Sequence, residues 1–122
     1  MSYQKLELNK NRVVTTKPKI IMRKRGILWV NSVALEKFFK GAERVYLFWD
    51  PENKKVGFQP TNKKKNSFSV SRIRKRNDAN IPGLSFFRYY NIDIPAVGTI
   101  FTPVWNEKEG LVEIDLKEKE RQ

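Results

Sequence analysis

The sequence predicts a small, β-rich α+β fold in which two similar β-β-α-β-β halves interleave in one barrel. Three observations lead to this prediction. The 122-residue chain contains 3 Trp, 4 Tyr and 8 Phe, which is too aromatic for a disordered tail. Apolar residues form short runs that end at turn-forming residues, as strands do. The same order of segments occurs twice, and neither copy alone is long enough to bury a substantial core.

The first half is expected at residues 19–60. Its strands are separated by turn-forming residues and are predicted at residues 19–24, 27–31, 44–49 and 56–60. Gly26 tolerates a positive φ and marks the first turn. A short helix follows the second strand, with Ser32 as its expected N-cap and Gly41 as its C-terminal stop.

The second half is expected at residues 67–116, with Asn77 at its first turn. Its strands are predicted at residues 67–74, 78–81, 99–105 and 111–116. Pro82 suits the first turn of the second helix, and Asn91 is a candidate stop. The remaining segments are an N-terminal extension that is a candidate edge strand, a basic linker and a charged, solvated tail, at residues 1–18, 61–66 and 117–122.

The repeat is visible when the chain is shifted against itself. A shift of 51 positions places the basic triplet Arg23–Arg25 on Arg74–Arg76, and each triplet precedes a short stretch with helical apolar spacing. After a short insertion, a shift of 56 places Trp49 on Trp105 and one hairpin turn on the other. A shared order of basic triplet, helix, tryptophan and hairpin favours two related halves about a pseudo-two-fold axis.

The positive charge is concentrated in one part of the chain. Residues 1–76 carry 20 basic and 5 acidic side chains, a net charge of +15, whereas residues 77–122 carry 5 and 8, a net charge of −3. This asymmetry indicates a face built for a polyanion. The cluster Lys63–Lys65 lies among turn residues and is most simply a linker.

Several function classes are excluded or disfavoured. With no His and no Cys, the chain has no zinc finger, iron–sulfur cluster, Ser–His triad or disulfide framework. The longest apolar run, Ile27–Val30, is far too short for a membrane span, and no signal-peptide core is present, so a cytoplasmic location is expected. No glycine-rich phosphate loop occurs, and the acidic residues that fall in turns or loops show no metal-binding spacing. We therefore expect no enzyme activity, no cofactor and no metal.

The segment order resembles the AbrB/SpoVT swapped-hairpin family. The residues that carry the resemblance are Gly26–Asn31, the apolar helix, Gly41 and the hairpin strand that ends at the Asp50 turn. The second copy keeps the Ile-Pro step of this module as Ile81-Pro82. Two copies in one chain resemble MraZ-type proteins, where a tandem pair replaces the dimer. The resemblance covers about residues 19–116 and implies a swapped-hairpin, cradle-loop type barrel.

Members of this family are mostly DNA-binding transcription regulators or antitoxins. They present basic residues from the turn between the first two strands, and their two-fold axis places both turns on one face. Two departures bear on the target: Ile27 and Asp78 stand where the family often has Arg, and the Asp-x-x-x-Arg signature of MraZ is absent from these turns. The resemblance therefore implies DNA as the partner without a particular operator.

These observations predict a double-stranded DNA-binding protein, either a repressor-like transcription regulator or a nucleoid-associated factor. The expected nucleic-acid-binding residues are basic and are Arg23, Lys24, Arg25, Arg72, Arg74, Lys75, Arg76 and Arg88. Arg25 and Arg76 suit guanine or bidentate phosphate contacts, and Lys24 and Lys75 suit backbone positioning. Neutralising about 5 to 7 phosphates gives an expected log–log salt slope of roughly −4.5 to −6.

Three alternatives remain open. In the first, both basic turns are simply solvated hairpin ends without a binding function. In the second, Phe86–Tyr90 with Trp29 and Phe68 forms a stacking platform for single-stranded DNA or RNA. Helical spacing places most of these aromatics in a core, with Arg88 and Tyr89 pointing outward, and Trp49 and Trp105 are expected to pack. The third alternative is an antitoxin-like or ring-forming homo-oligomeric module, or one with an acidic protein partner.

Overall fold

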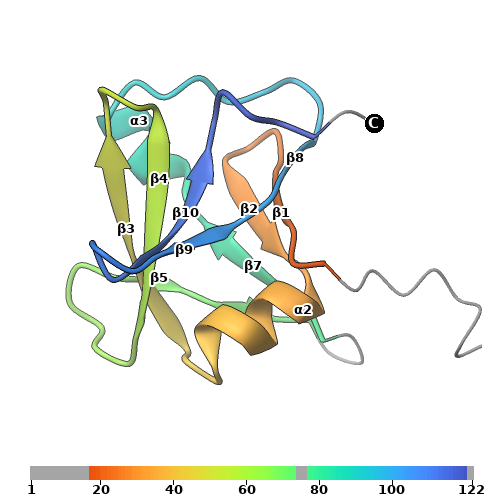
Figure 1. Cartoon of the computed structure of the whole chain (residues 1–122), viewed down its shortest axis with the longest axis vertical. Helices are drawn as coiled ribbons and strands as arrows, with labels where there is room; N and C mark the ends of the chain where they lie inside the picture. The colour runs from red at the N-terminus through yellow and green to blue at the C-terminus, as the bar shows by residue number, and fades with distance from the viewer. Residues whose placement is uncertain (1–16, 74–76, 121–122) are drawn as a thin grey trace, which may run out of the picture.

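A computed structural model describes residues 17–73 and 77–120 as a β-rich α+β fold with two antiparallel five-stranded sheets and two short helices (Figure 1). Residues 1–16, Arg74–Arg76 and 121–122 lie outside the described part of the chain, and with them most of the candidate N-terminal edge strand. No helix among the described residues has the length and apolar character needed to cross a bilayer.

The first sheet has the strand order β6-β7-β2-β1-β8. Its strands are short, pair antiparallel throughout and are β1 (Ile20–Met22), β2 (Ile27–Val30), β6 (Ser71–Arg72), β7 (Ala79–Pro82) and β8 (Thr99–Phe101). Leu28 and Val30 on β2 are fully buried, whereas Trp29 between them is half-buried. This period-2 alternation gives the sheet one face on the core and one outward face.

The second sheet has the strand order β5-β3-β4-β10-β9. Its strands are also antiparallel and are β3 (Arg44–Asp50), β4 (Lys55–Thr61), β5 (Phe68–Ser69), β9 (Val104–Asn106) and β10 (Leu111–Asp115). The two sheets enclose the core, which contains the fully buried side chains of Phe39, Phe58 and Phe87. Phe39 and Phe58 pack edge to face, with ring centroids 6.3 Å apart.

Continuous chain joins the two sheets at both edges. Val70 alone separates β5 from β6, and Thr102 and Pro103 separate β8 from β9. The single strands predicted at residues 67–74 and 99–105 are therefore each divided by a bend, and Pro103 has no N–H to donate to a ladder. The described strands thus form two separate sheets. They do not form the closed barrel that the sequence predicted.

The two segments predicted as halves contribute strands to both sheets. Strand β1 pairs with β8, with Ile21 opposite Ile100, and β5 pairs with β3, with Phe68 opposite Val45. The first strand of each segment therefore pairs with the third strand of the other. The hairpins β3–β4 and β9–β10 have the same register when shifted by 56 positions, because Trp49 faces Val56 and Trp105 faces Val112.

The first helix begins one residue earlier than the sequence indicates. Asn31, not Ser32, is the N-cap of α2 (Ser32–Ala34), because the Asn31 Oδ1 accepts a hydrogen bond from the Ala34 N–H at 2.9 Å. The helix continues as one π turn, η1 (Leu35–Phe39). It ends at Lys40 and Gly41, which both have positive φ (43° and 81°). Gly41 therefore stops the helix, as predicted from the sequence.

The second helix is α3 (Leu84–Tyr89). Its N-cap is Gly83, and Pro82 ends β7, so the prediction that Pro82 lies in the helix is wrong. The reason is the β2–β7 ladder, in which Pro82 pairs opposite Ile27 and extends the strand by one residue. Asn91, with a φ of 53°, follows the helix as the predicted stop.

The cap assignment makes a testable prediction. We expect Asn31→Ala to lower the free energy of unfolding by about 2–4 kcal/mol, because it removes the cap and leaves buried backbone groups without partners. Ser32→Ala is the matched control and should change stability by less than about 0.5 kcal/mol. Urea unfolding of both variants measures this difference. A larger loss for Ser32→Ala would contradict the assignment.

Candidate nucleic-acid interface

The basic cluster Arg23–Arg25 forms the tight turn between β1 and β2. The Gly26 N–H donates to the Arg23 carbonyl at 3.0 Å, and the Arg23 N–H donates to the Ile27 carbonyl at 2.8 Å. Arg25 has a φ of 95° and Gly26 a φ of 74°. A positive φ at the third position is the pattern of a type II turn, where glycine is the usual residue. An arginine therefore stands at a backbone position that strains it.

Gly26 fixes this turn against the start of α3. A side-chain Cβ at Gly26 would lie 2.7 Å from the Leu84 Cα, a distance that the two backbones do not permit. The Gly83 N–H donates to the Gly26 carbonyl at 2.9 Å. The turn is therefore held on one side by its own strands and on the other by α3, which begins 58 residues after Gly26.

The three cations of the turn are exposed and have no ionic partner. Within residues 17–73 and 77–120, no carboxylate lies within 4.0 Å of a charged nitrogen of Arg23, Lys24 or Arg25. Other cations of the chain are engaged: Lys19 pairs with Glu120, and the Lys55 Nζ lies 3.8 Å from the Glu113 Oε1. The turn thus presents three charges that are available to an anion.

A tryptophan on the outward face of the first sheet supports this turn. The guanidinium carbon of Arg23 lies 5.6 Å from the centroid of the Trp29 ring, within the range of a cation–π contact. The Trp29 Nε1 donates to the Asp78 Oδ2 at 2.8 Å, which orients the indole. The sequence predicted Trp29 only as a core residue or as part of a stacking platform. The contact between Arg23 and Trp29 follows from the pairing of β1 with β2, which the residue pattern alone does not give.

Of the remaining predicted binding residues, Arg72 lies away from this turn. Arg72 on β6 is exposed, and its Nη2 donates to the Ala42 carbonyl at 3.0 Å. Strands β2 and β7 run antiparallel, with Ile27 opposite Pro82 and Val30 opposite Ala79, so the β1–β2 turn and the β6–β7 connection are at opposite ends of this pair. The structure therefore does not bring Arg72 beside the β1–β2 turn, and Arg74, Lys75 and Arg76 lie outside the described residues.

The aromatic residues are divided between core and surface. Phe86 and Phe87 are buried, as predicted from their helical spacing, and Tyr89 is 79% exposed beside the exposed Arg88. Trp49 packs against the core, but Trp105 is 51% exposed, so the prediction that both tryptophans pack is wrong. Trp105 lies on β9, which is an edge strand of the second sheet among the described strands.

The acidic residues of the turns have local roles. The Asp50 carboxylate accepts hydrogen bonds from the Asn53 side chain at 2.9 Å and from the backbone N–H groups of Asn53 and Glu52. These hydrogen bonds lower the pKa of Asp50 from its ordinary value, and the bond from the Asn53 side chain has the largest effect. Asp50 therefore caps its own hairpin turn, while Asp78 holds Trp29 and Asp93 borders a separate pocket.

The strain at Arg25 makes a second prediction. We expect Arg25→Gly to raise the free energy of unfolding by about 0.5–1 kcal/mol, because glycine adopts a φ of 95° without a steric penalty. Arg25→Ala keeps the penalty and should leave stability nearly unchanged. Thermal and urea unfolding of both variants give the comparison. Equal stability of the glycine and alanine variants would show that Arg25 is not strained.

Comparison with known proteins assigns the chain to no family. No protein-family model, curated protein or solved structure matches it. The functional conclusion therefore depends on the geometry and charge of the basic turn.

Proposed function

We propose that this protein binds double-stranded DNA through the basic turn between β1 and β2, as a repressor-like transcription regulator or a nucleoid-associated factor. The observation that carries this proposal is the combination found at Arg23–Arg25: three exposed cations, no carboxylate partner among the described residues, and a rigid backbone with a strained arginine. Backbone strain at an exposed, charged residue is typical of a functional site.

The pairing of the strands supports a swapped-hairpin arrangement of the AbrB/SpoVT type, with two tandem halves in one chain. The first strand of each predicted half pairs with the third strand of the other, and the two closing hairpins share one register. In such an arrangement the antiparallel β2–β7 pair contains the pseudo-two-fold axis. Trp29 and Asn80, which the 51-residue shift aligns, face each other across this pair.

This arrangement gives the basic segments separate contacts on one duplex. From the β2–β7 register, Gly26 and Asn77 are about six residues apart along the strands, roughly 20 Å at 3.3 Å per residue. That distance corresponds to about six base pairs at 3.4 Å each. Arg23, Lys24 and Arg25 would neutralise phosphates at one end, and the sequence predicts the same role for Arg74, Lys75 and Arg76, which lie outside the described residues.

The charge of the turn can be tested against an equal charge elsewhere. In Arg23→Gln/Lys24→Gln/Arg25→Gln three cations are removed from the turn, and in the control Lys63→Gln/Lys64→Gln/Lys65→Gln three are removed from the exposed β4–β5 loop. We expect the turn variant to weaken duplex binding about 10- to 100-fold at low salt and to reduce the log–log salt slope by about 2.7, because three phosphate contacts are lost. Fluorescence anisotropy with a mixed-sequence duplex at several salt concentrations measures both quantities.

The control decides what the result means. The loop variant should lose less than about threefold in affinity, since charges far from the contact act only through a screened field. Equal losses in both variants would mean that overall charge, not the turn, determines binding. No loss in the turn variant, with its fold intact by circular dichroism, would remove the turn from the interface.

A second candidate function is single-strand binding at the end of α3. The observation that favours it is the exposed pair Tyr89 and Tyr90, whose rings lie 4.8 Å apart beside Arg88. Exposed aromatics next to a cation stack on unpaired bases, each stacked base contributing about 1–3 kcal/mol.

The single-strand function has its own test. Arg88→Ala/Tyr89→Ala should weaken binding to single-stranded DNA or RNA at least fivefold if this site is used, and should leave duplex binding unchanged. Anisotropy with an oligothymidine and with the duplex separates the two functions. Stronger binding to the duplex than to the oligothymidine, with no effect of this variant on either, would leave the β1–β2 turn as the binding surface.

A further inference from the structure

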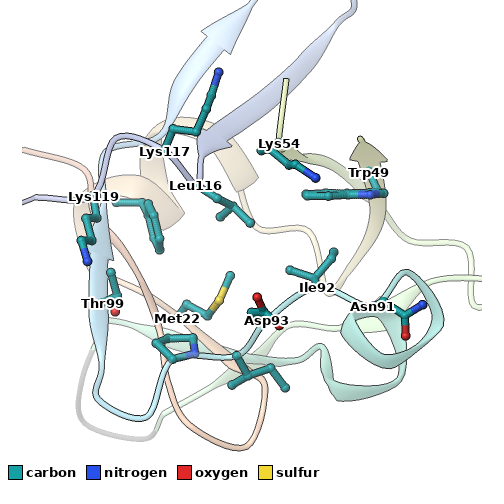
Figure 2. Close-up of a pocket in the computed structure, with 13 residues that line it drawn as sticks. Met22, Trp49, Lys54, Asn91, Ile92, Asp93, Thr99, Leu116, Lys117 and Lys119 are labelled. Carbon is teal, nitrogen blue, oxygen red and sulfur yellow. The ribbon is translucent and has the colours of Figure 1, made fainter. Parts of the chain in front are cut away.

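A pocket of about 380 Å³ lies between the two sheets, at the end where β1 and β3 finish (Figure 2). Its walls come from the end of β1, the end of β3 with the β3–β4 turn, the segment after α3, strand β8 and the chain after β10. The pocket has the volume of a small-ligand site. Because it is built from five separate segments, no local motif in the sequence indicates it.

The floor of the pocket is apolar. Met22, Ile92 and Phe101 form it and are 1%, 8% and 4% exposed, respectively. The partly buried side chains of Trp49 and Leu116 extend this surface toward the opening. A ligand on this floor would remove apolar surface from water, which stabilises a bound hydrocarbon or aromatic group by about 25 cal/mol per Å² buried.

The rim of the pocket is cationic. Lys54, Lys117 and Lys119 contribute to the lining, and the Lys54 Nζ lies 6.0 Å from the centroid of the Trp49 ring. No carboxylate within the described part of the chain forms an ion pair with these three lysines. Asp93, whose carboxylate points toward the cavity in Figure 2, is the one acidic residue of the lining.

Backbone contacts fix this rim. The Leu116 N–H donates to the Lys54 carbonyl at 3.0 Å, which joins the β3–β4 turn to the chain after β10. Lys119 forms an isolated antiparallel bridge with Phe101 of β8, and the Glu120 N–H donates to the Ile100 carbonyl at 2.7 Å. The lysines are therefore carried by backbone segments whose positions relative to the floor are set before any ligand binds.

We infer that this pocket binds a small amphipathic anion, of the class of a medium-chain acyl or an aryl carboxylate. The apolar part of the ligand lies on Met22, Ile92 and Phe101, and its carboxylate lies at the cationic rim formed by Lys54, Lys117 and Lys119. A neutral hydrocarbon uses only the floor, an inorganic anion uses only the rim, and a cation meets a net positive rim. The ligand that uses both features carries a negative charge at one end of an apolar body.

Octanoate is the probe for this inference, with octan-1-ol and octylammonium as the neutral and cationic controls of equal length. Binding to the full chain is followed by isothermal titration calorimetry and by the fluorescence of Trp49, with Trp29→Phe/Trp105→Phe to isolate that signal. We expect octanoate to bind saturably and at least tenfold more tightly than octan-1-ol, and octylammonium not to bind. Raising the salt concentration should reduce the difference between octanoate and octan-1-ol, since the rim is exposed.

Two variants with opposite expected signs assign the site. Lys54→Gln/Lys119→Gln should weaken octanoate binding about 3- to 10-fold, and Asp93→Asn should tighten it about two- to fivefold, because one removes attraction and the other removes repulsion. Lys63→Gln/Lys64→Gln is the control with the same charge change outside the pocket and should have no effect. The four lysines and the one aspartate that these variants change are all exposed and lie outside the core.

The inference is overturned by any of three results. These are no saturable octanoate binding to the wild-type chain, equal affinity for octanoate and octan-1-ol, or equal effects of the pocket and loop lysine variants. The first two need no variant, so they hold even if a substitution disturbs the fold. The result is also independent of DNA binding, because the calorimetry uses the unsubstituted chain and the site is assigned by substitutions at Lys54, Lys119 and Asp93, which lie outside the β1–β2 turn.

Discussion

The amide side chain of Asn31 is the interaction on which the arrangement of the first sheet depends. It is 6% exposed, and its Oδ1 accepts from the N–H groups of Lys19 at 3.0 Å and Ala34 at 2.9 Å, while its Nδ2 donates to the Lys17 carbonyl at 3.0 Å. One side chain thus joins the chain before β1, the end of β2 and the start of α2. Because β1 lies between β2 and β8, its placement also sets the contact between the two predicted halves. The basic turn lies at the opposite end of the β1–β2 hairpin from Asn31.

The sequence predicted the elements better than it predicted their ends. Alternating apolar residues and the alignment of Trp49 with Trp105 indicated two hairpins, and both have that register in the structure. The cap at Asn31 was missed because Asn and Ser are equally good N-caps, and it is the contacts with Lys17 and Lys19 that favour the asparagine. The bends at Val70 and Pro103 were missed for a related reason. A strand that passes from one sheet to another keeps its alternation, so its pattern alone does not reveal the break.

The candidate sites differ in how far a sequence can reveal them. Charge clustering marks Arg23–Arg25 as a surface turn, since three consecutive cations are rarely buried. The strain at Arg25 becomes visible only from the backbone of the turn, and the close approach of Gly26 to Leu84 depends on α3, which lies almost 60 residues further along the chain. The pocket is a more extreme case, because its floor residues are ordinary core residues when taken one by one. Only the fold places Met22 and Ile92 beside Lys54.

The uneven charge of the chain has a structural use as well as the proposed functional one. Both ion pairs among the described residues, Lys19 with Glu120 and Lys55 with Glu113, join a cation from the basic part of the chain to a carboxylate from the acidic part. They lie where the two predicted halves meet, beside the β1–β8 and β4–β10 contacts. The hydrogen bond from Lys19 is the main cause that lowers the pKa of Glu120, so its stabilisation is present above the unfolded pKa and is lost as the pH falls through the folded value. The acidic part therefore neutralises the cations at the seam between the halves. The cations of the β1–β2 turn pair with no carboxylate among the described residues and keep their charge for a partner.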